Sequence, residues 1–390
     1  NVEGKLLSAK AVSVNGLVDA LAKMAFGNKI GVDIADIDEA RLFAPLYGSI
    51  IVETTEALDD AELIGKTTDA SAITCKGESV DMDELIEVWE SAMRSVYPES
   101  KTTEGKVQKI EYTGGPVAFA KEKFAAPQVF IPVFPGTNCE YDTAKAFENA
   151  GAKPEIVVFR NRTADDIAAS VKEMADAIRQ SQMIMIPGGF SAGDQPDGSG
   201  KFIAAVFRNP EIRDAVMELI KNRDGLMLGI CNGFQALIKL GLVPYGEIVD
   251  IEPEMPTLTY NTIGRHVSTI PMTKVVSNLS PWLAGAKVGE TYRIPMSHGE
   301  GRFIASDAVM KELIAKGQVA TQYVDFDGNA TMDGAFNPNG STCAVEGITS
   351  ADGRILGKMG HSERIGKGLY KNIPGEKDQR IFKSGVEYFK

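Results

Sequence analysis

Apolar runs and helix-like repeats alternate along the chain from residue 128 onward. Short, nearly continuous apolar runs are typical of strands buried on both faces, whereas apolar residues at intervals of three and four indicate amphipathic helices. The expected strands are 128–134, 154–159, 182–189 and 224–230, and the expected helices are 141–152, 164–180 and 233–242. Strands that alternate with helices form βαβ units, so the pattern predicts an α/β fold with a mostly parallel, doubly wound sheet covered by helices on both faces.

The first part of the chain has a different pattern. Residues 14–26 have helical spacing, 48–54 read as a short strand, and 81–98 read as a helix with an acidic first turn and a proline stop. This is an α+β pattern. The chain of 390 residues exceeds the roughly 250–300 residues at which single cores stop growing. We therefore predict an α+β segment over 1–110, a linker over 111–127 where periodicity is lost, and the α/β domain over 128–390.

Charge and cysteine content exclude several classes of protein. The net charge of −12 opposes a phosphate backbone, which argues against a nucleic acid partner. No apolar run approaches the roughly 20 residues of a membrane span. The four cysteines contain no C-x-x-C pair, so neither a zinc site nor a disulfide framework is expected. With no signal peptide at the start, the sequence is interpreted as a mature cytoplasmic protein or a piece of a longer one.

A possible nucleophile lies in the stretch MLGICNGFQAL. Cys231 falls between an apolar strand and a helix, with Gly229 and Gly233 two residues away on either side. A sharp strand-to-helix turn exposes a side chain at the carboxyl edge of the sheet, near a helix N-terminus that favours thiolate over thiol. A buried structural cysteine is the alternative. Cys139, which also lies near a helix start, is a rival nucleophile.

A thiol nucleophile needs a base, and two histidines fit. His298 and His361 are each followed two residues later by an acid, Glu300 and Glu363 respectively. In an extended segment these side chains share a face, so the carboxylate can orient the imidazole. His266 has no such acid and is interpreted as a surface or hydrogen-bonded histidine. The residues do not separate the two candidates, although a strand-like run before His361 favours it.

An acyl-transfer site also needs backbone N–H groups that stabilise an oxyanion. The stretch 185–195 ends an apolar strand with Gly188 and Gly189, which leave their amides accessible. An ordinary glycine-rich turn is the alternative. Strand ends at the carboxyl edge of a parallel sheet share one crevice, so this loop and Cys231 are expected to meet.

Six motifs carry a resemblance to a known family. In order along the chain they are PGTNCEYD, PGGFSAGD, GICNGFQAL, SHGEGRF, NPNGS and HSER. Their order and spacing resemble the class I glutamine amidotransferase domain of phosphoribosylformylglycinamidine synthases of the large single-chain form, over residues 128–390. The preceding segment, 1–110, resembles the C-terminal portion of the aminoimidazole-synthetase-like half of the same enzymes.

The resemblance implies a role for each matching residue. It places the nucleophile on Cys231 and the His–Glu pair on His361 and Glu363. The further implied positions are the oxyanion hole (Gly189, Asn232), glutamine contacts (Gly188, Gln235, Asn337, Ser341) and supporting residues (His298, Glu300). No metal is implied. Two positions depart from the family pattern, since Ser362 stands where proline is usual and residues 13–16 read Ser-Val-Asn-Gly in place of an acidic, glycine-rich turn.

The implied activity is glutamine hydrolysis that supplies ammonia for ATP-dependent conversion of formylglycinamide ribonucleotide to formylglycinamidine ribonucleotide, a step of purine biosynthesis. The partners are then glutamine and the remaining N-terminal portion of the synthase. No cofactor is expected in this chain, whereas ATP and Mg²⁺ are expected in the full-length enzyme. Two alternatives stay open: a catalytically idle interaction fragment that needs the missing portion, and a cysteine hydrolase on the same fold.

Overall fold

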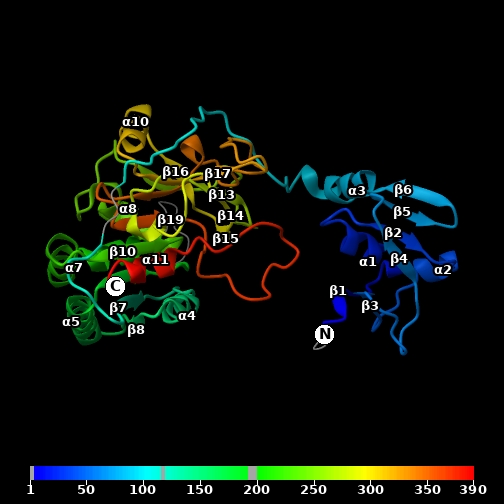
Figure 1. Cartoon of the computed structure of the whole chain (residues 1–390), viewed down its shortest axis with the longest axis horizontal. Coiled ribbons are helices and arrows are strands. Elements are labelled where there is room, and N and C mark those ends of the chain that lie inside the picture. The colour runs from blue at the N-terminus through cyan, green and yellow to red at the C-terminus, as the bar shows by residue number, and fades with distance from the viewer. Residues whose placement is uncertain (1–3, 116–118, 192–199) are drawn as a thin grey trace. The chain divides into compact units, whose positions relative to one another are not determined.

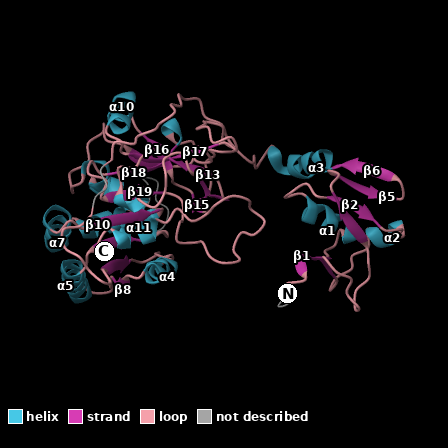
Figure 2. Cartoon of the chain, in the orientation of Figure 1, coloured by secondary structure: helices cyan, strands magenta, loops and turns pink. Residues whose placement is uncertain are grey.

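The computed structural model describes residues 4–115, 119–191 and 200–390. Its contacts divide the chain into two compact units, Asn1–Glu99 and Ser100–Lys390. Each unit has its own cluster of buried apolar side chains. Figures 1 and 2 label the elements of both units.

The stretch predicted to be a linker is bonded to the second unit. The backbone N–H of Ala120 donates to the Tyr388 carbonyl, and that of Phe124 donates to the Phe389 carbonyl, each at 2.9 Å. Tyr112 forms a parallel β-bridge with Ser277. The division between units therefore lies before the predicted boundary at 110, because an aperiodic segment can still pair its backbone with a neighbouring surface. Residues 116–118 of the predicted linker lie outside the described residues.

The first unit is a mixture of strands and helices. Strands β1 and β3 form an antiparallel pair, and a four-stranded sheet has the order β4-β2-β5-β6. Asp81 caps α3 by accepting from the N–H groups of Asp83 and Glu84, which satisfies donors at the predicted helix start. The bounds are β1 Leu6–Ala11, α1 Gly16–Ala25, β2 Gly31–Ile34, α2 Glu39–Leu42, β3 Ile50–Thr54, β4 Gly65–Thr68, β5 Ala72–Cys75, β6 Glu78–Asp81 and α3 Met82–Arg94.

The second unit is built on a nine-stranded sheet with the order β14-β13-β17-β18-β19-β10-β9-β7-β8. The neighbours from β19 to β8 are all parallel, as predicted for the strands that carry the candidate site. The parallel half and its helices are β7 Gln128–Val133, α4 Glu140–Ala150, β8 Lys153–Val158, α5 Ala164–Gln180, β9 Met183–Ile186, α6 Lys201–Phe207, α7 Pro210–Asn222, β10 Leu226–Ile230, α8 Asn232–Leu240, α9 Leu242–Tyr245, β19 Ile355–Lys358 and α11 Ile381–Glu387.

The other half of the sheet is antiparallel from β14 to β19, and two small antiparallel pairs, β11–β16 and β12–β15, lie outside it. Several of these strands have only three residues, too few to show a period in the sequence. Their bounds, with the intervening helices, are β11 Thr257–Thr259, β12 Val267–Thr269, β13 Met272–Val275, η1 Pro281–Leu283, β14 Thr291–Arg293, β15 Met296–His298, β16 Arg302–Ile304, α10 Asp307–Ala315, β17 Val319–Val324, η2 Thr342–Ala344 and β18 Val345–Thr349.

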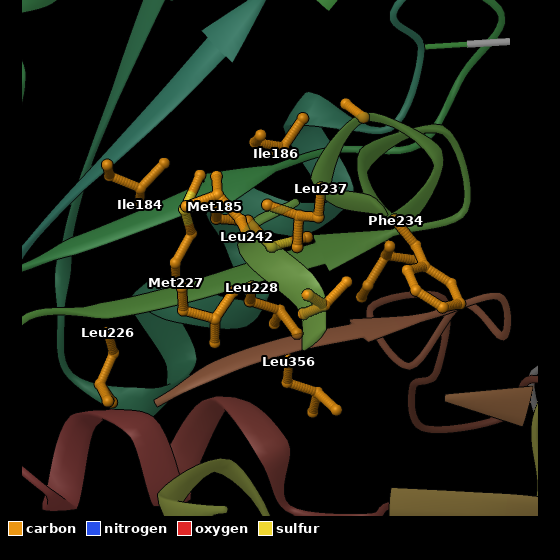
Figure 3. Close-up of a cluster of buried hydrophobic side chains, with 14 of the residues drawn as sticks. Ile184, Met185, Ile186, Leu226, Met227, Leu228, Phe234, Leu237, Leu242 and Leu356 are labelled. Atoms are coloured by element: carbon orange, nitrogen blue, oxygen red, sulfur yellow. The ribbon is translucent and has the colours of Figure 1, made fainter. Parts of the chain in front are cut away.

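The core of the second unit lies where α8 packs against the parallel strands. Strands β9 and β10 are buried at every position, and all but one residue of α8 is buried. Figure 3 shows the side chains that meet there: Ile184, Met185, Ile186, Leu226, Met227, Leu228, Phe234, Leu237, Leu242 and Leu356. Burial of this apolar surface fixes the start of α8 against the strand ends. In the described part of the chain, none of the helices has the length and apolar character that crossing a bilayer requires.

Candidate active site

Cys231 occupies a strained turn between β10 and α8. Its backbone has φ 53° and ψ −106°, an uncommon conformation for a residue with a side chain. Its N–H donates to the Lys358 carbonyl at 2.9 Å, which anchors the turn to the neighbouring strand β19. The thiol is buried, with 3% of the residue exposed. Strain of this kind persists only where the surroundings enforce it, and it concentrates at functional sites.

The glycines beside this turn are required by close packing. A Cβ at Gly233 would lie 2.0 Å from the Ile186 carbonyl oxygen, and a Cβ at Gly229 would lie 2.7 Å from the backbone carbonyl of Gly233. Neither distance is possible without movement of the strand or the helix. The two glycines of G-x-C-x-G are therefore required for α8 to begin in direct contact with β9 and β10.

His361 and Glu363 meet immediately after β19. Glu363 Oε1 lies 2.6 Å from His361 Nδ1, and both side chains are buried. Strands β10 and β19 are parallel neighbours, with Ile230 opposite Lys358, so their carboxyl ends deliver Cys231 and His361 to the same edge. The side-by-side strands are visible in Figure 1. Since Glu363 occupies Nδ1, the other ring nitrogen is left for a reacting group.

Gly188 brings this group of side chains together. A Cβ built on Gly188 would lie 2.6 Å from His361 Cε1, 3.0 Å from Cys139 Sγ and 3.4 Å from Cys231 Cβ. Only a glycine leaves the space in which these three side chains approach one another. The sequence-predicted residues Cys231, His361 and Gly188, which are far apart in the chain, are thus neighbours in the fold.

Electrostatics favour the charged form of both members of the His–Glu pair. Burial lowers the pKa of His361, but Glu363 and the thiols of Cys231 and Cys139 raise it more, so that it lies well above 6.5. Burial raises the pKa of Glu363, but His361 lowers it more, so that it lies below 4.5. An imidazolium held between a carboxylate and a thiol can donate a proton to a leaving group.

Replacing Glu363 by Gln is expected to move the alkaline limb of the Cys231 reaction rate to lower pH. Because the pKa of His361 is raised, the ring stays an imidazolium, and stabilises the folded state, at pH values below that pKa. Both the charge and its contribution to folding stability are lost as the pH rises through the pKa. Without Glu363, burial pulls the His361 pKa down, so the imidazolium is lost sooner. The measurement is the alkylation rate of Cys231 as a function of pH in both proteins. An unchanged alkaline limb would show that Glu363 does not set the protonation of His361.

Two further loops close on the candidate nucleophile. Asn138 N–H donates to the Gly188 carbonyl at 3.3 Å, and Thr137 forms an antiparallel bridge with Gly189. The N–H of Ser191 donates to Asn232 Oδ1 at 3.2 Å. The loops after β7, β9 and β10 therefore meet at one edge, as expected for a parallel sheet. That the amides of Gly189 and Asn232 form an oxyanion hole stays a prediction. Residues 192–194 of the PGGFSAGD motif lie outside the described residues.

The predicted glutamine contacts have partners within the protein. Gln235 Oε1 accepts from Asn232 Nδ2 at 2.8 Å, and Gln235 Nε2 donates to the Glu300 carbonyl at 2.5 Å. In the NPNGS loop, Asn337 Oδ1 accepts from the Ser341 N–H at 3.1 Å, and Asn337 Nδ2 donates to the Ser341 carbonyl at 3.0 Å. These bonds give the side chains a role in shaping the loops, and contact with glutamine stays a prediction for them.

His298 differs from His361 in its partner and in its protonation. Its Nδ1 lies 3.0 Å from Asn261 Oδ1, so an amide occupies the position that a carboxylate occupies at His361. Burial, followed by the nearby His361, lowers the pKa of His298 to about 3. A histidine with this pKa stays neutral near pH 7. The two H-x-E segments, equivalent in the sequence, therefore have different chemistry.

Strand β15 also contacts the Cys231 thiol. Cys231 Sγ lies 3.8 Å from the Ser297 carbonyl oxygen. The hydroxyl of Ser297 lies 2.9 Å from Nε2 of His266, an exposed histidine whose ring is also near Phe190. His266 is thus the hydrogen-bonded surface histidine that the sequence indicated, at the rim of the site.

Cys139 and Arg364 belong to this cluster, and the sequence identified only the first, as a rival nucleophile. Cys139 Sγ lies 3.9 Å from His361 Nδ1 and accepts a hydrogen bond from Arg364 Nη2 at 2.9 Å. Donor atoms of Cys139, His361 and Glu363 lie within 4.8 Å of one another. A divalent metal would have to break the His361–Glu363 bond and to sit near the Arg364 guanidinium, so we interpret the cluster as acid–base machinery.

Comparison with known proteins identifies the family of the chain. Residues 126–389 match the family model described as the CobB/CobQ-like glutamine amidotransferase domain. A relative from Methanococcus maripaludis, "Phosphoribosylformylglycinamidine synthase subunit PurQ", is 35% identical over 281 residues, which are 67% of this chain and 98% of the relative.

Other relatives carry the same name. The protein from Rhodospirillum rubrum is 35% identical over 257 residues, which are 66% of this chain and 97% of the relative. A solved structure of PurLQS from Thermotoga maritima is 27% identical with a TM-score of 0.48, and the alignment covers 68% of this chain and 100% of that chain. Because a family model matches residues 126–389 and a relative is 35% identical over 281 residues, the chain belongs to the family of CobB/CobQ-like glutamine amidotransferases, among relatives of the PurQ subunit of phosphoribosylformylglycinamidine synthase.

Proposed function

We propose that this chain hydrolyses glutamine and supplies the ammonia for the phosphoribosylformylglycinamidine synthase reaction. The names of its relatives support the reaction, and the family match over 126–389 supports the use of glutamine. The observation that carries the proposal is the geometry of one edge of the sheet. There, the strained Cys231 turn lies beside a buried His361–Glu363 pair whose atoms are 2.6 Å apart.

The chemistry is acyl transfer through a thioester. The Cys231 thiolate attacks the side-chain carboxamide carbon of glutamine, and the amides of Gly189 and Asn232 stabilise the oxyanion. His361, oriented by Glu363, gives its proton to the leaving nitrogen, which departs as ammonia. The neutral imidazole then takes a proton from water as the water attacks the thioester. Glutamate leaves, and the thiolate–imidazolium pair is restored.

The remaining steps belong to other parts of the synthase. Ammonia is consumed where ATP activates formylglycinamide ribonucleotide, and ATP and Mg²⁺ are bound in that portion, with no cofactor in this chain. The partners of the chain are glutamine and the other synthase portions. The first unit is the C-terminal portion of the aminoimidazole-synthetase-like half, a proposal that rests on the sequence resemblance. The enzyme works in the cytoplasm.

Labelling with a diazo-ketone analogue of glutamine tests the proposal. We expect stoichiometric alkylation, mapped by peptide mass spectrometry to Cys231, with protection by free glutamine and slower labelling of a His361→Ala variant. Alkylation at Cys139 would show that Cys231 is not the nucleophile. Hydrolysis of peptide esters without glutamine protection would indicate a cysteine hydrolase. Absence of labelling until the other synthase portions are added would indicate a site that is idle in this chain.

A further inference from the structure

A fully buried lysine is bonded both to the turn of the candidate nucleophile and to the turn that carries its base. Lys358 ends strand β19, and its side chain has no exposed surface. Its carbonyl accepts the Cys231 N–H at 2.9 Å. Its ammonium donates to the Gly360 carbonyl at 2.9 Å and to Ser362 Oγ at 3.1 Å. The two acceptors flank His361 on either side in the sequence.

The charge of this lysine is balanced by a buried glutamate from the adjacent strand β18. Glu346 Oε1 lies 3.3 Å from Lys358 Nζ and also accepts the Gly360 N–H at 2.7 Å. Thr321 donates to the second carboxylate oxygen. The three N–H groups of the ammonium thus face three acceptors, on Gly360, Ser362 and Glu346. The turn that carries His361 is held by its backbone on one side and by a hydroxyl on the other.

Ser362 connects this turn to a second buried amide. Its hydroxyl accepts from Lys358 and donates to Gln379 Oε1 at 2.9 Å. Gln379 is fully buried. Ser362 is the residue that departs from the proline expected between the histidine and the glutamate. The hydrogen bonds of Ser362 restrain a backbone that proline would otherwise restrain through its ring.

We propose that Lys358, paired with Glu346, is a positioning residue that fixes the His361–Glu363 turn relative to Cys231. In the described part of the chain, the Lys358 ammonium bonds to Gly360, Ser362 and Glu346 and not to the Cys231 thiol. Lys358 acts through its carbonyl on the Cys231 turn and through its ammonium on both sides of His361. The inference rests on the proposed glutaminase function and adds a residue to its machinery.

The free energies involved favour a positioning role for the Lys358–Glu346 pair over a stabilising one. A buried ion pair is often no more stable than apolar residues of similar volume, because desolvation offsets the attraction between the charges. Stability alone therefore gives little reason for a lysine at the end of an otherwise apolar strand. Misplacement of a catalytic group by about 1 Å, in contrast, can cost about 100-fold in rate.

The test compares two variants that differ in whether a charge is left unpaired. Lys358→Met leaves Glu346 buried without its cation, and the fold is expected to lose stability. Lys358→Met/Glu346→Gln removes both charges and is expected to regain thermal stability close to wild type. Lys274→Met is the matched control, because Lys274 also donates to a backbone carbonyl, of Gly328 at 2.7 Å, but on strand β13.

The readout is alkylation of Cys231 by the diazo-ketone analogue, analysed as a maximal rate and a half-saturating concentration. We expect the folded double variant to keep its half-saturating concentration within about 3-fold while its maximal rate falls roughly 10- to 100-fold, as for other outer-shell positioning groups. The control is expected to match wild type in both. This split separates placement of the base from binding of the analogue and from folding.

A double variant with wild-type stability and a wild-type maximal rate would overturn the inference. If the double variant does not fold, Ser362→Ala serves instead, because it keeps the Lys358–Glu346 pair and removes one tie to the turn; an unchanged maximal rate there would overturn the inference too. Failure of the proposed function is distinguishable, because in that case wild type itself is not alkylated at Cys231.

Discussion

Replacing Cys231 by alanine is expected to lower glutamine hydrolysis by about 10⁴-fold or more, the scale seen when a covalent nucleophile is removed. The variant is expected to stay folded, because it removes one small side chain whose polar contacts are to the Ser297 carbonyl oxygen, at 3.8 Å, and to His361. The measurement is glutamate release in the presence of the other synthase portions, together with the thermal unfolding midpoint. Synthase activity with added ammonia in place of glutamine is expected to survive, because only the acyl-transfer step needs the thiol.

Two other buried cysteines provide controls. The Cys343 thiol accepts hydrogen bonds from the Gln108 N–H at 3.4 Å and from Gln322 Nε2 at 3.8 Å, so it is held by residues outside the Cys231–His361 cluster, and Cys343→Ala is expected to leave hydrolysis unchanged. Cys139→Ala removes a neighbour of His361 but not the attacking atom, and is expected to retain measurable turnover. Loss of turnover in Cys139→Ala with full turnover in Cys231→Ala would reverse the assignment of the nucleophile.

Replacing Gly233 by alanine is expected to destabilise the second unit by about 3 kcal/mol, by analogy with other overpacked cores. The added Cβ would lie 2.0 Å from the Ile186 carbonyl oxygen, so α8 or β9 has to move. Alanine favours a helix over glycine by about 1 kcal/mol, which opposes the effect without cancelling it. The unfolding midpoint is expected to fall by roughly 5 to 10 °C, measured by calorimetry or circular dichroism.

Gly366→Ala is the matched control for this prediction. The nearest atom to a Cβ there is Leu369 Cδ1 at 3.6 Å, an ordinary contact, and Gly366 is exposed. Its unfolding midpoint is expected to stay within about 1 °C of wild type, as for most surface changes. If both glycine variants melt at the same temperature as wild type, close packing of α8 on β9 is not what requires Gly233.

The sequence by itself determined most of the parallel half of the fold, although helices α6, α7, α9 and α11 were not predicted. Strands β7 to β10 and helices α4, α5 and α8 lie at the predicted places, because each has a local period or apolar run long enough to be read. It also determined the turn at Cys231. A cysteine between two glycines, at the junction of a strand and a helix, specifies that turn through local sterics. The structure gives the reason, because a Cβ on Gly233 would lie 2.0 Å from the Ile186 carbonyl oxygen.

Only the tertiary structure shows how the surroundings of the two histidines differ. The spacing to the following glutamate is the same in both, but Asn261 reaches His298 Nδ1 from 37 residues away, whereas Glu363 reaches His361 Nδ1. Which side chain arrives at an imidazole depends on strand pairing, and no local pattern encodes that pairing.

The same reason applies to the remaining features that the sequence did not show. Arg364 reaches Cys139 across 225 residues, and the buried Lys358–Glu346 pair joins two strands that are antiparallel neighbours. The stretch after residue 100 has no period, yet its backbone pairs with the second unit. Local sequence fixes the elements and their turns through sterics and periodicity, whereas contacts between distant residues form only when burial of apolar surface brings those elements together.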